Sequence, residues 1–141
     1  MFGAAGVKVG EMPLAESAPG RLAAAPTIDD LRDALDKLAA LNGRDVDETG
    51  LIDHLGALEA LKGALAAAQA RVTVSLVRAR TERESSQGVP AERRCQGLAA
   101  EIALARRTSP HRGARELGLA KALVQEMPRT LAALTRGQIS E

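Results

Sequence analysis

The sequence of 141 residues has almost no aromatic side chains, because it contains one Phe and neither Trp nor Tyr. RNA-binding sheets and single-strand platforms stack bases on aromatic rings, so this composition argues against both classes. A single cysteine, Cys95, excludes an intramolecular disulfide framework and a thiolate zinc cluster. Any core must therefore be aliphatic, built from Leu, Ala, Val, Ile and Met.

Long hydrophobic runs are also missing. Near the N-terminus, Glu11 and Pro13 interrupt the apolar stretch before it reaches the length of a signal sequence, and no segment is long enough to span a membrane. Residues 1–26 are rich in Gly, Ala and Pro and are expected to form a disordered leader, with Met12 as an alternative start. We expect a cytoplasmic protein without a membrane partner.

The residues that are abundant, Ala, Leu, Glu and Arg, are strong helix formers, while β-branched residues are few and mostly isolated. This composition predicts an all-α fold. Residues 27–141 are expected to form one helical bundle, with one long helix over about 51–81 and several short helices.

The N-terminal half predicts two helices. Thr27 and Asp30 have the spacing of a capping box, and Asn42-Gly43 is a stop signal. The long helix carries an apolar stripe close to heptad spacing, which could pair with a second copy or a partner. Gly56 and Gly63 lie within this helix and indicate either close approach of a neighbour or neutral drift. The residues of the stripe are Leu51, Leu55, Leu58, Leu65, Ala68, Val72 and Leu76.

The C-terminal half predicts three shorter helices. Gly88 and Pro90 separate the long helix from one over residues 91–107. Ser109-Pro110 is a strong start signal for the next, which ends or kinks at Pro128, and a last helix over 129–136 closes at Gly137. The expected inner faces are Cys95, Leu98, Ile102 and Ala105, then Leu117, Ala120, Val124 and Met127.

The sequence shows no arrangement suited to catalysis. His54 and His111 are its only histidines, and it lacks a metalloprotease motif, a phosphate-binding glycine loop and a Cys-x-x-Cys pair. Cys95 falls on an apolar stripe, which favours a buried, inert thiol. We therefore expect no enzyme, no catalytic residue, no metal and no cofactor.

Charge is distributed unevenly along the chain. Residues 1–70 have a balance of −5 and residues 71–141 a balance of +6, and twelve of the thirteen basic residues in the second half are Arg. This split indicates either an anionic partner for the C-terminal half or the drift of an Ala- and Arg-rich composition.

The most suggestive basic segment is "ARRTSPHRGAR", at the predicted junction between two helices. Arg106 and Arg107 end the first helix, where cations are favoured by the helix dipole. Arg112 and Arg115 lie in the opening turns of the second, where a positive charge is locally unfavourable unless it faces an anion. We interpret the junction, with His111, as a phosphate-binding site for DNA. Lys121, Arg129 and Arg136 would add a more diffuse positive field.

Residues 97–141 resemble the 13E12 repeat family, proteins carrying domain-of-unknown-function family 222 that are abundant in actinobacteria. The likeness rests on "AEIALARR", "SP", "MPRT", "AL" and "GQIS". In the N-terminal half, "LEALKGALAAAQARV" is similar to the long helix of that family. The likeness covers roughly residues 28–141.

Full-length members of the 13E12 family commonly continue into an HNH nuclease domain, whose histidines surround a divalent metal. The resemblance implies that this chain is the N-terminal part of such a protein, truncated before the nuclease domain. A weaker likeness to the helix-turn-helix region of ParB-like proteins rests on Leu117-Gly118, Met127-Pro128 and residues 137–140. Here the spacing is too short for a separate recognition helix, which argues against base-specific reading.

These observations predict a non-catalytic helical domain that contacts DNA phosphates weakly and without sequence preference. In full-length relatives it would accompany an HNH nuclease. Two alternatives remain open: a helical module for self-association or protein interaction, or a non-functional truncated remnant of a repeated element.

Overall fold

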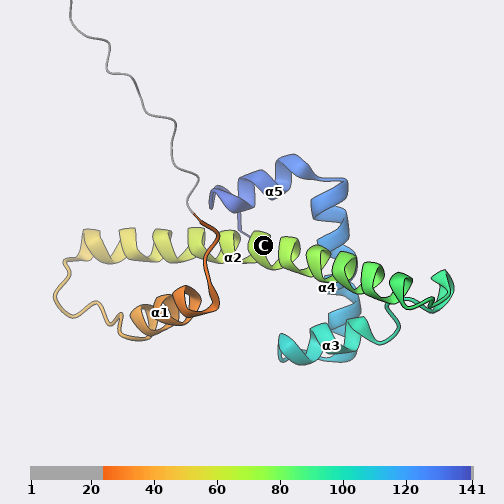
Figure 1. Ribbon diagram of the computed structural model, residues 1–141. Helices are drawn as coiled ribbons and strands as arrows, with labels where there is room; N and C mark the ends of the chain where they lie inside the picture. The colour runs from red at the N-terminus through yellow and green to blue at the C-terminus, as the bar shows by residue number, and fades with distance from the viewer. Residues whose placement is uncertain (1–23, 141) are drawn as a thin grey trace, which may run out of the picture. The chain divides into compact units, whose positions relative to one another are not determined.

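The computed structural model describes residues 24–140 and divides into two units, the first reaching Asn42 and the second starting at Gly43. The predicted disordered leader falls mainly on residues 1–23, outside the described residues. Residues 24–140 contain helices and no strand, which confirms the all-α prediction (Figure 1). The elements are α1 (Ile28–Ala39), α2 (Glu48–Ser86), the 3-10 turn η1 (Ala91–Arg93), α3 (Leu98–Ala105), α4 (Pro110–Gln125) and α5 (Pro128–Thr135).

Helix α1 is the only helix among residues 24–42, the described part of the first unit. Its predicted capping box is present, because Thr27 Oγ1 accepts from the Asp30 N–H while the Asp30 carboxylate accepts from the Thr27 N–H. The helix ends at Ala39, a little before the predicted stop at Asn42-Gly43, and Gly43 adopts a φ of 68°. None of its residues is buried.

Helix α2 extends beyond the predicted 51–81 range at both ends. Its N-terminus is fixed by Asp47, whose side chain accepts a hydrogen bond from the Gly50 N–H at 2.9 Å. Past Thr81 the helix continues to Ser86, supported by an i,i+4 ion pair between Arg78 and Glu82. Gly88, with a φ of 74°, ends the helical segment, so the predicted break is confirmed.

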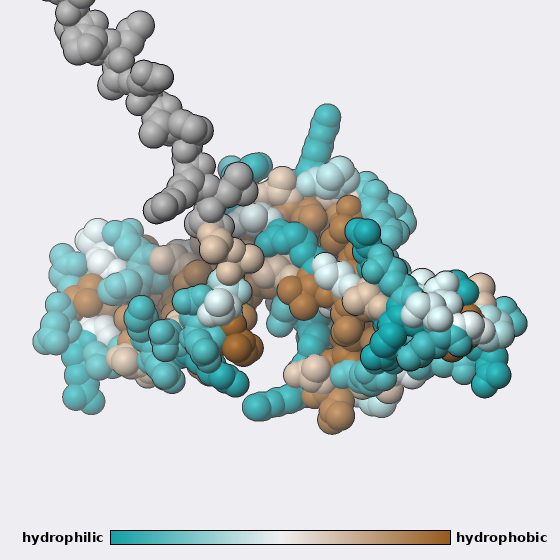
Figure 2. Space-filling model, in the orientation of Figure 1, coloured by the Kyte–Doolittle hydropathy of each residue, from teal (hydrophilic) through white to brown (hydrophobic). Residues whose placement is uncertain are grey.

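Helix α2 packs within the second unit through small residues. Its buried positions are Gly63, Ala67, Ala70 and Thr73, and α4 and α5 both pack against this helix. The predicted leucine stripe does not supply that contact, because Leu55 is 68% exposed and Val72 is 67% exposed. Apolar residues are accordingly visible among charged ones on the surface of the second unit (Figure 2). The core cluster comprises Ala67, Ala70, Ala120, Leu123 and Leu134.

The two glycines inside α2 have different surroundings. A methyl group on Gly63 would lie 2.5 Å from the backbone oxygen of Ile139 and 3.3 Å from that of Leu134. Nothing lies within 4 Å of the corresponding position on Gly56. The close approach of a neighbouring segment therefore explains why glycine stands at position 63. No contact in the structure explains the glycine at position 56.

We expect Gly63→Ala to lower the free energy of unfolding by about 1–3 kcal/mol, because the added methyl group meets backbone that cannot rotate away. Gly56→Ala is the matched control in the same helix and should raise it by up to about 1 kcal/mol through helix propensity alone. Urea unfolding followed by circular dichroism measures both. Equal effects of the two changes would contradict the close packing at Gly63.

The helix predicted over residues 91–107 is wrong in its first half. Only a 3-10 turn forms at Ala91–Arg93, and α3 starts at Leu98. Cys95 has a φ of 59°, which no α-helix allows, and its N–H donates to the Glu84 carboxylate at 2.7 Å. Its Sγ lies 3.2 Å from Thr81 Oγ1. These hydrogen bonds to α2 override local helix propensity, and they leave Cys95 half-buried in a loop rather than on an apolar helix face.

Helix α3 is held against its neighbours by apolar and polar contacts. Leu98, Ile102 and Ala103 are buried, and α3 packs on α4. The predicted inner position Ala105 is exposed instead. On its polar side, both terminal nitrogens of Arg80 in α2 donate to the Glu101 carboxylate. These hydrogen bonds lower the pKa of Glu101.

Helix α4 begins as predicted. Ser109 caps it by accepting from the Arg112 N–H, and Pro110 occupies the first turn. Of its expected inner positions, Ala120 is buried and Leu117 and Val124 are half-buried. Met127 is 38% exposed because α4 has ended before it. Leu123 is buried in its place, one turn earlier on the helix.

Candidate functional site: a basic cluster beside an apolar groove

The first two arginines of the predicted site lie at the C-terminal end of α3. Arg106 caps the helix, and Arg107 follows it with a φ of 55°. The Thr108 N–H donates to the Ala103 carbonyl and the Arg107 N–H to that of Leu104, which is the hydrogen-bond pattern of a Schellman motif. Arg107 therefore occupies a position that glycine usually holds, and its side chain is exposed.

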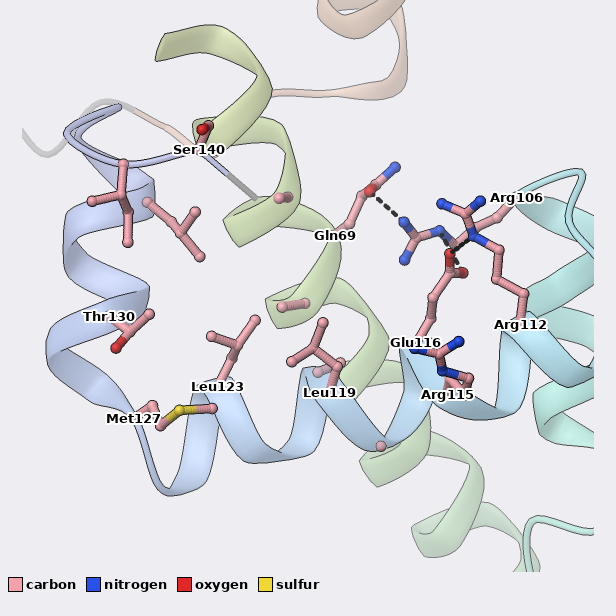
Figure 3. Close-up of a pocket in the computed structure, with 16 residues that line it drawn as sticks. Gln69, Arg106, Arg112, Arg115, Glu116, Leu119, Leu123, Met127, Thr130 and Ser140 are labelled. Carbon is pink, nitrogen blue, oxygen red and sulfur yellow. Dashed lines mark hydrogen bonds and ion pairs between the residues drawn. The ribbon is translucent and has the colours of Figure 1, made fainter. Parts of the chain in front are cut away.

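Arg106 and Arg112 meet at one carboxylate. The Nε atom of Arg106 lies 3.1 Å from Glu116 Oε2, and that of Arg112 lies 2.9 Å from Glu116 Oε1. Arg106 also donates to the side-chain oxygen of Gln69 in α2 at 2.9 Å. Figure 3 shows these interactions as a chain that links α2, the end of α3 and the first turns of α4. Sharing one carboxylate leaves the pair of guanidinium groups with a net positive charge.

Arg115 adds a third guanidinium group to this cluster. It is exposed, and it has no ion-pair partner among residues 24–140. His111, one turn before it on α4, is exposed as well. We name Arg106, Arg112, Arg115 and Glu116 the basic cluster, in which three cations face one anion.

The other predicted basic residues lie elsewhere on the second unit. Lys121 is on α4 but five residues beyond Glu116, which places it on a different side of the helix. Arg129 is exposed in the first turn of α5. Arg136 follows α5, and its Nε donates to the Gln138 side chain at 3.1 Å. None of these three lines the cavity that borders the basic cluster.

An apolar groove starts at the basic cluster and runs along α4. Its volume is about 830 Å³, and it is bounded by α2, α4, α5 and the segment after α5. In Figure 3, Leu119 and Leu123 of α4 point into it, with Thr130 on the opposite wall. The apolar lining residues are Ala66, Ala70, Leu119, Ala120, Leu123, Met127, Leu134 and Ile139.

Sequence reasoning found the arginines but missed Glu116 and Gln69. Glu116 could have been found, because it follows Arg112 by four residues on a helix, the spacing of a surface ion pair. Gln69 is 37 residues from Arg106, and no local pattern predicts that contact. The groove was also missed, since it depends on how α4 and α5 pack on α2.

Within residues 24–140, no group of three or more His, Cys, Asp or Glu side chains is placed to hold a metal ion. No helix in that part of the chain is long and apolar enough to cross a membrane.

Comparisons with known proteins leave the chain without an assigned relative: no family model, no curated protein and no solved structure matches it.

Proposed function

We propose that the chain is a non-catalytic helical domain that binds the phosphates of nucleic acid at the junction of α3 and α4. One observation carries this proposal: Arg106 and Arg112 share the Glu116 carboxylate, and Arg115, which lines the same cavity, has no ion-pair partner among residues 24–140, so the junction has an uncompensated positive charge. Arginine is the side chain best suited to phosphate, because its planar fork donates two parallel hydrogen bonds.

The surroundings of the basic cluster support a polyanion as its ligand. Arg107, exposed two residues before Ser109, adds a further positive charge to the junction, and His111 is exposed in the first turn of α4. The Ser109-capped end of α4 adds the positive end of a helix dipole. We do not propose base-specific recognition. Only Glu126 and Met127 separate α4 from α5, so there is no separate recognition helix between them. Binding through phosphates alone is weak, independent of sequence and sensitive to salt.

The test is fluorescence anisotropy with a labelled DNA duplex at salt concentrations from about 50 to 200 mM. We expect Arg112→Glu/Arg115→Glu to weaken binding at least about tenfold and to lower the salt slope by about 2, since each phosphate contact contributes about 0.9 to it. Far-UV circular dichroism should be unchanged, because both side chains are exposed.

The matched control is Arg78→Glu/Arg93→Glu, which changes the net charge equally at exposed arginines outside the basic cluster. This control should retain most of the affinity. Equal losses in both double variants would assign binding to net charge rather than to the junction. A concentration-dependent dimer that is indifferent to DNA would instead favour the self-association module.

The resemblance to the 13E12 family adds a biological setting to this proposal. In full-length proteins of that kind, the domain would hold DNA for an attached HNH nuclease. The residues of this domain would bind the DNA, and the attached nuclease would cut it. The sequence after the GQIS segment in the gene is the direct test of this setting.

A further inference from the structure

The apolar groove is not explained by phosphate binding. Phosphates need cations and N–H donors, whereas the floor of the groove consists of aliphatic side chains from α2, α4 and α5. Leu119 is 55% exposed and Met127 is 38% exposed, although both line the groove. Exposed apolar side chains in a concave surface mark a binding site for an apolar partner.

The charged end of the groove restricts what that partner can be. Residues Arg112, Arg115, Glu116, Leu119 and Leu123 recur at intervals of three and four on α4, so they form one face of the helix. Cations stand at the N-terminal end of this face and leucines follow (Figure 3). The complementary ligand carries negative charge at one end and apolar groups along the rest.

The size and openness of the groove favour a helix over a small molecule. Small-molecule sites bury most of their ligand, whereas the exposure of Leu119 shows that this groove is open along one side. A helix leaves its outer face in water and needs burial on one face only. The volume of about 830 Å³ is large enough for the apolar side chains on one face of a helix.

We infer that the groove between α4, α5 and α2 binds an amphipathic α-helix of a partner protein. Its apolar side chains, at i, i+3 or i+4, and i+7, contact Leu119, Leu123 and Met127. Its acidic residues lie at the end nearest α3 and pair with Arg112 and Arg115. This inference goes beyond nucleic-acid binding and does not rest on it, because the leucine and methionine contacts have no role with phosphates.

The experiment is selection from a displayed library of 18-residue helical peptides on the immobilised full chain, without nucleic acid. We expect enriched sequences to combine an apolar face with acidic residues at one end. The best peptide, labelled with fluorescein, should lose at least about tenfold in affinity for Leu119→Gln, which removes the apolar contact without adding a charge. Replacing its acidic residues by lysine should cause a similar loss.

Leu119→Gln separates this inference from the proposed function. Leu119 is exposed, so the variant should keep its helicity, and it should bind DNA nearly as well as the parent chain because it leaves the arginines in place. Equal enrichment of peptides on the parent chain and on the Leu119→Gln chain would overturn the inference, and so would peptides that bind through acidic residues alone. A third outcome would also overturn the inference. If no helical peptide is enriched, but dodecanoate displaces an environment-sensitive dye in a way that depends on both Leu119 and Arg115, the groove binds a small amphiphile instead.

Discussion

Replacing Leu98 by alanine is expected to lower the free energy of unfolding by about 2–5 kcal/mol. Leu98 has no exposed surface and is the largest fully buried side chain among the described residues. Its removal costs the transfer free energy of the lost methyl and methylene groups and leaves a cavity at the start of α3. A loss of this size is a large fraction of the stability of a small domain. Urea unfolding followed at 222 nm measures it.

Leu104→Ala is the matched control for this prediction, since it makes the same change in the same helix. Leu104 is 81% exposed, so its truncation should alter stability by about 0.5 kcal/mol or less. Both variants change helix propensity in the same way, so the difference between their free energies of unfolding measures the effect of burial. If Leu104→Ala destabilised the chain as much as Leu98→Ala, α3 would pack through a different face from the one described.

Gly113→Ala is expected to destabilise the chain by forcing α3 and α4 apart. The added methyl group would lie 2.5 Å from Ala103 Cβ, 2.6 Å from the Ala99 carbonyl oxygen and 3.1 Å from Ala103 Cα. These atoms belong to the α3 backbone or are fixed directly to it, so α3 and α4 must move apart. We expect a loss of about 1–3 kcal/mol, seen as a lower midpoint of thermal unfolding.

Gly118→Ala provides the control in the same helix, because nothing lies within 4 Å of its added methyl group. It should stabilise the chain by up to about 1 kcal/mol, since alanine is the better helix former. Gly113→Ala should also weaken DNA binding, because separating α3 from α4 moves Arg106 away from Glu116. A Gly113→Ala chain as stable as Gly118→Ala would show that the helices do not cross at Gly113.

Local signals correctly predicted the starts of α1 and α4 and the glycine that follows α5. The capping box of Thr27, the Ser109-Pro110 start and the left-handed glycine at 137 all depend on residues within one turn of each other. These interactions depend only on residues that are close together in the chain, so a single sequence is enough to predict them. The all-α class follows in the same way from composition.

Long-range contacts explain where prediction from sequence failed. The segment around Cys95 has an acceptable helical pattern, but the Glu84 carboxylate of α2 binds its backbone and holds it in another conformation. The packing face of α2 was also missed, because leucines dominate hydrophobic patterns while alanines and a glycine make the contact. For the candidate site, the arginines of the junction were predictable from their helix positions. The shared carboxylate and the groove required the packing of α4 and α5 on α2.

The small residues on the buried face of α2 determine which part of this helix can lie against the segment that contains Leu134 and Ile139. The carbonyl groups of Leu134 and Ile139 fit against Gly63 because that position has no side chain. A shift by one helical turn, about 5.4 Å, would place Ala67 or Glu59 there instead, and either side chain would collide with them. The glycine thus excludes a shift by one helical turn, and this alignment is specified by an absent methyl group rather than by a large interlocking side chain.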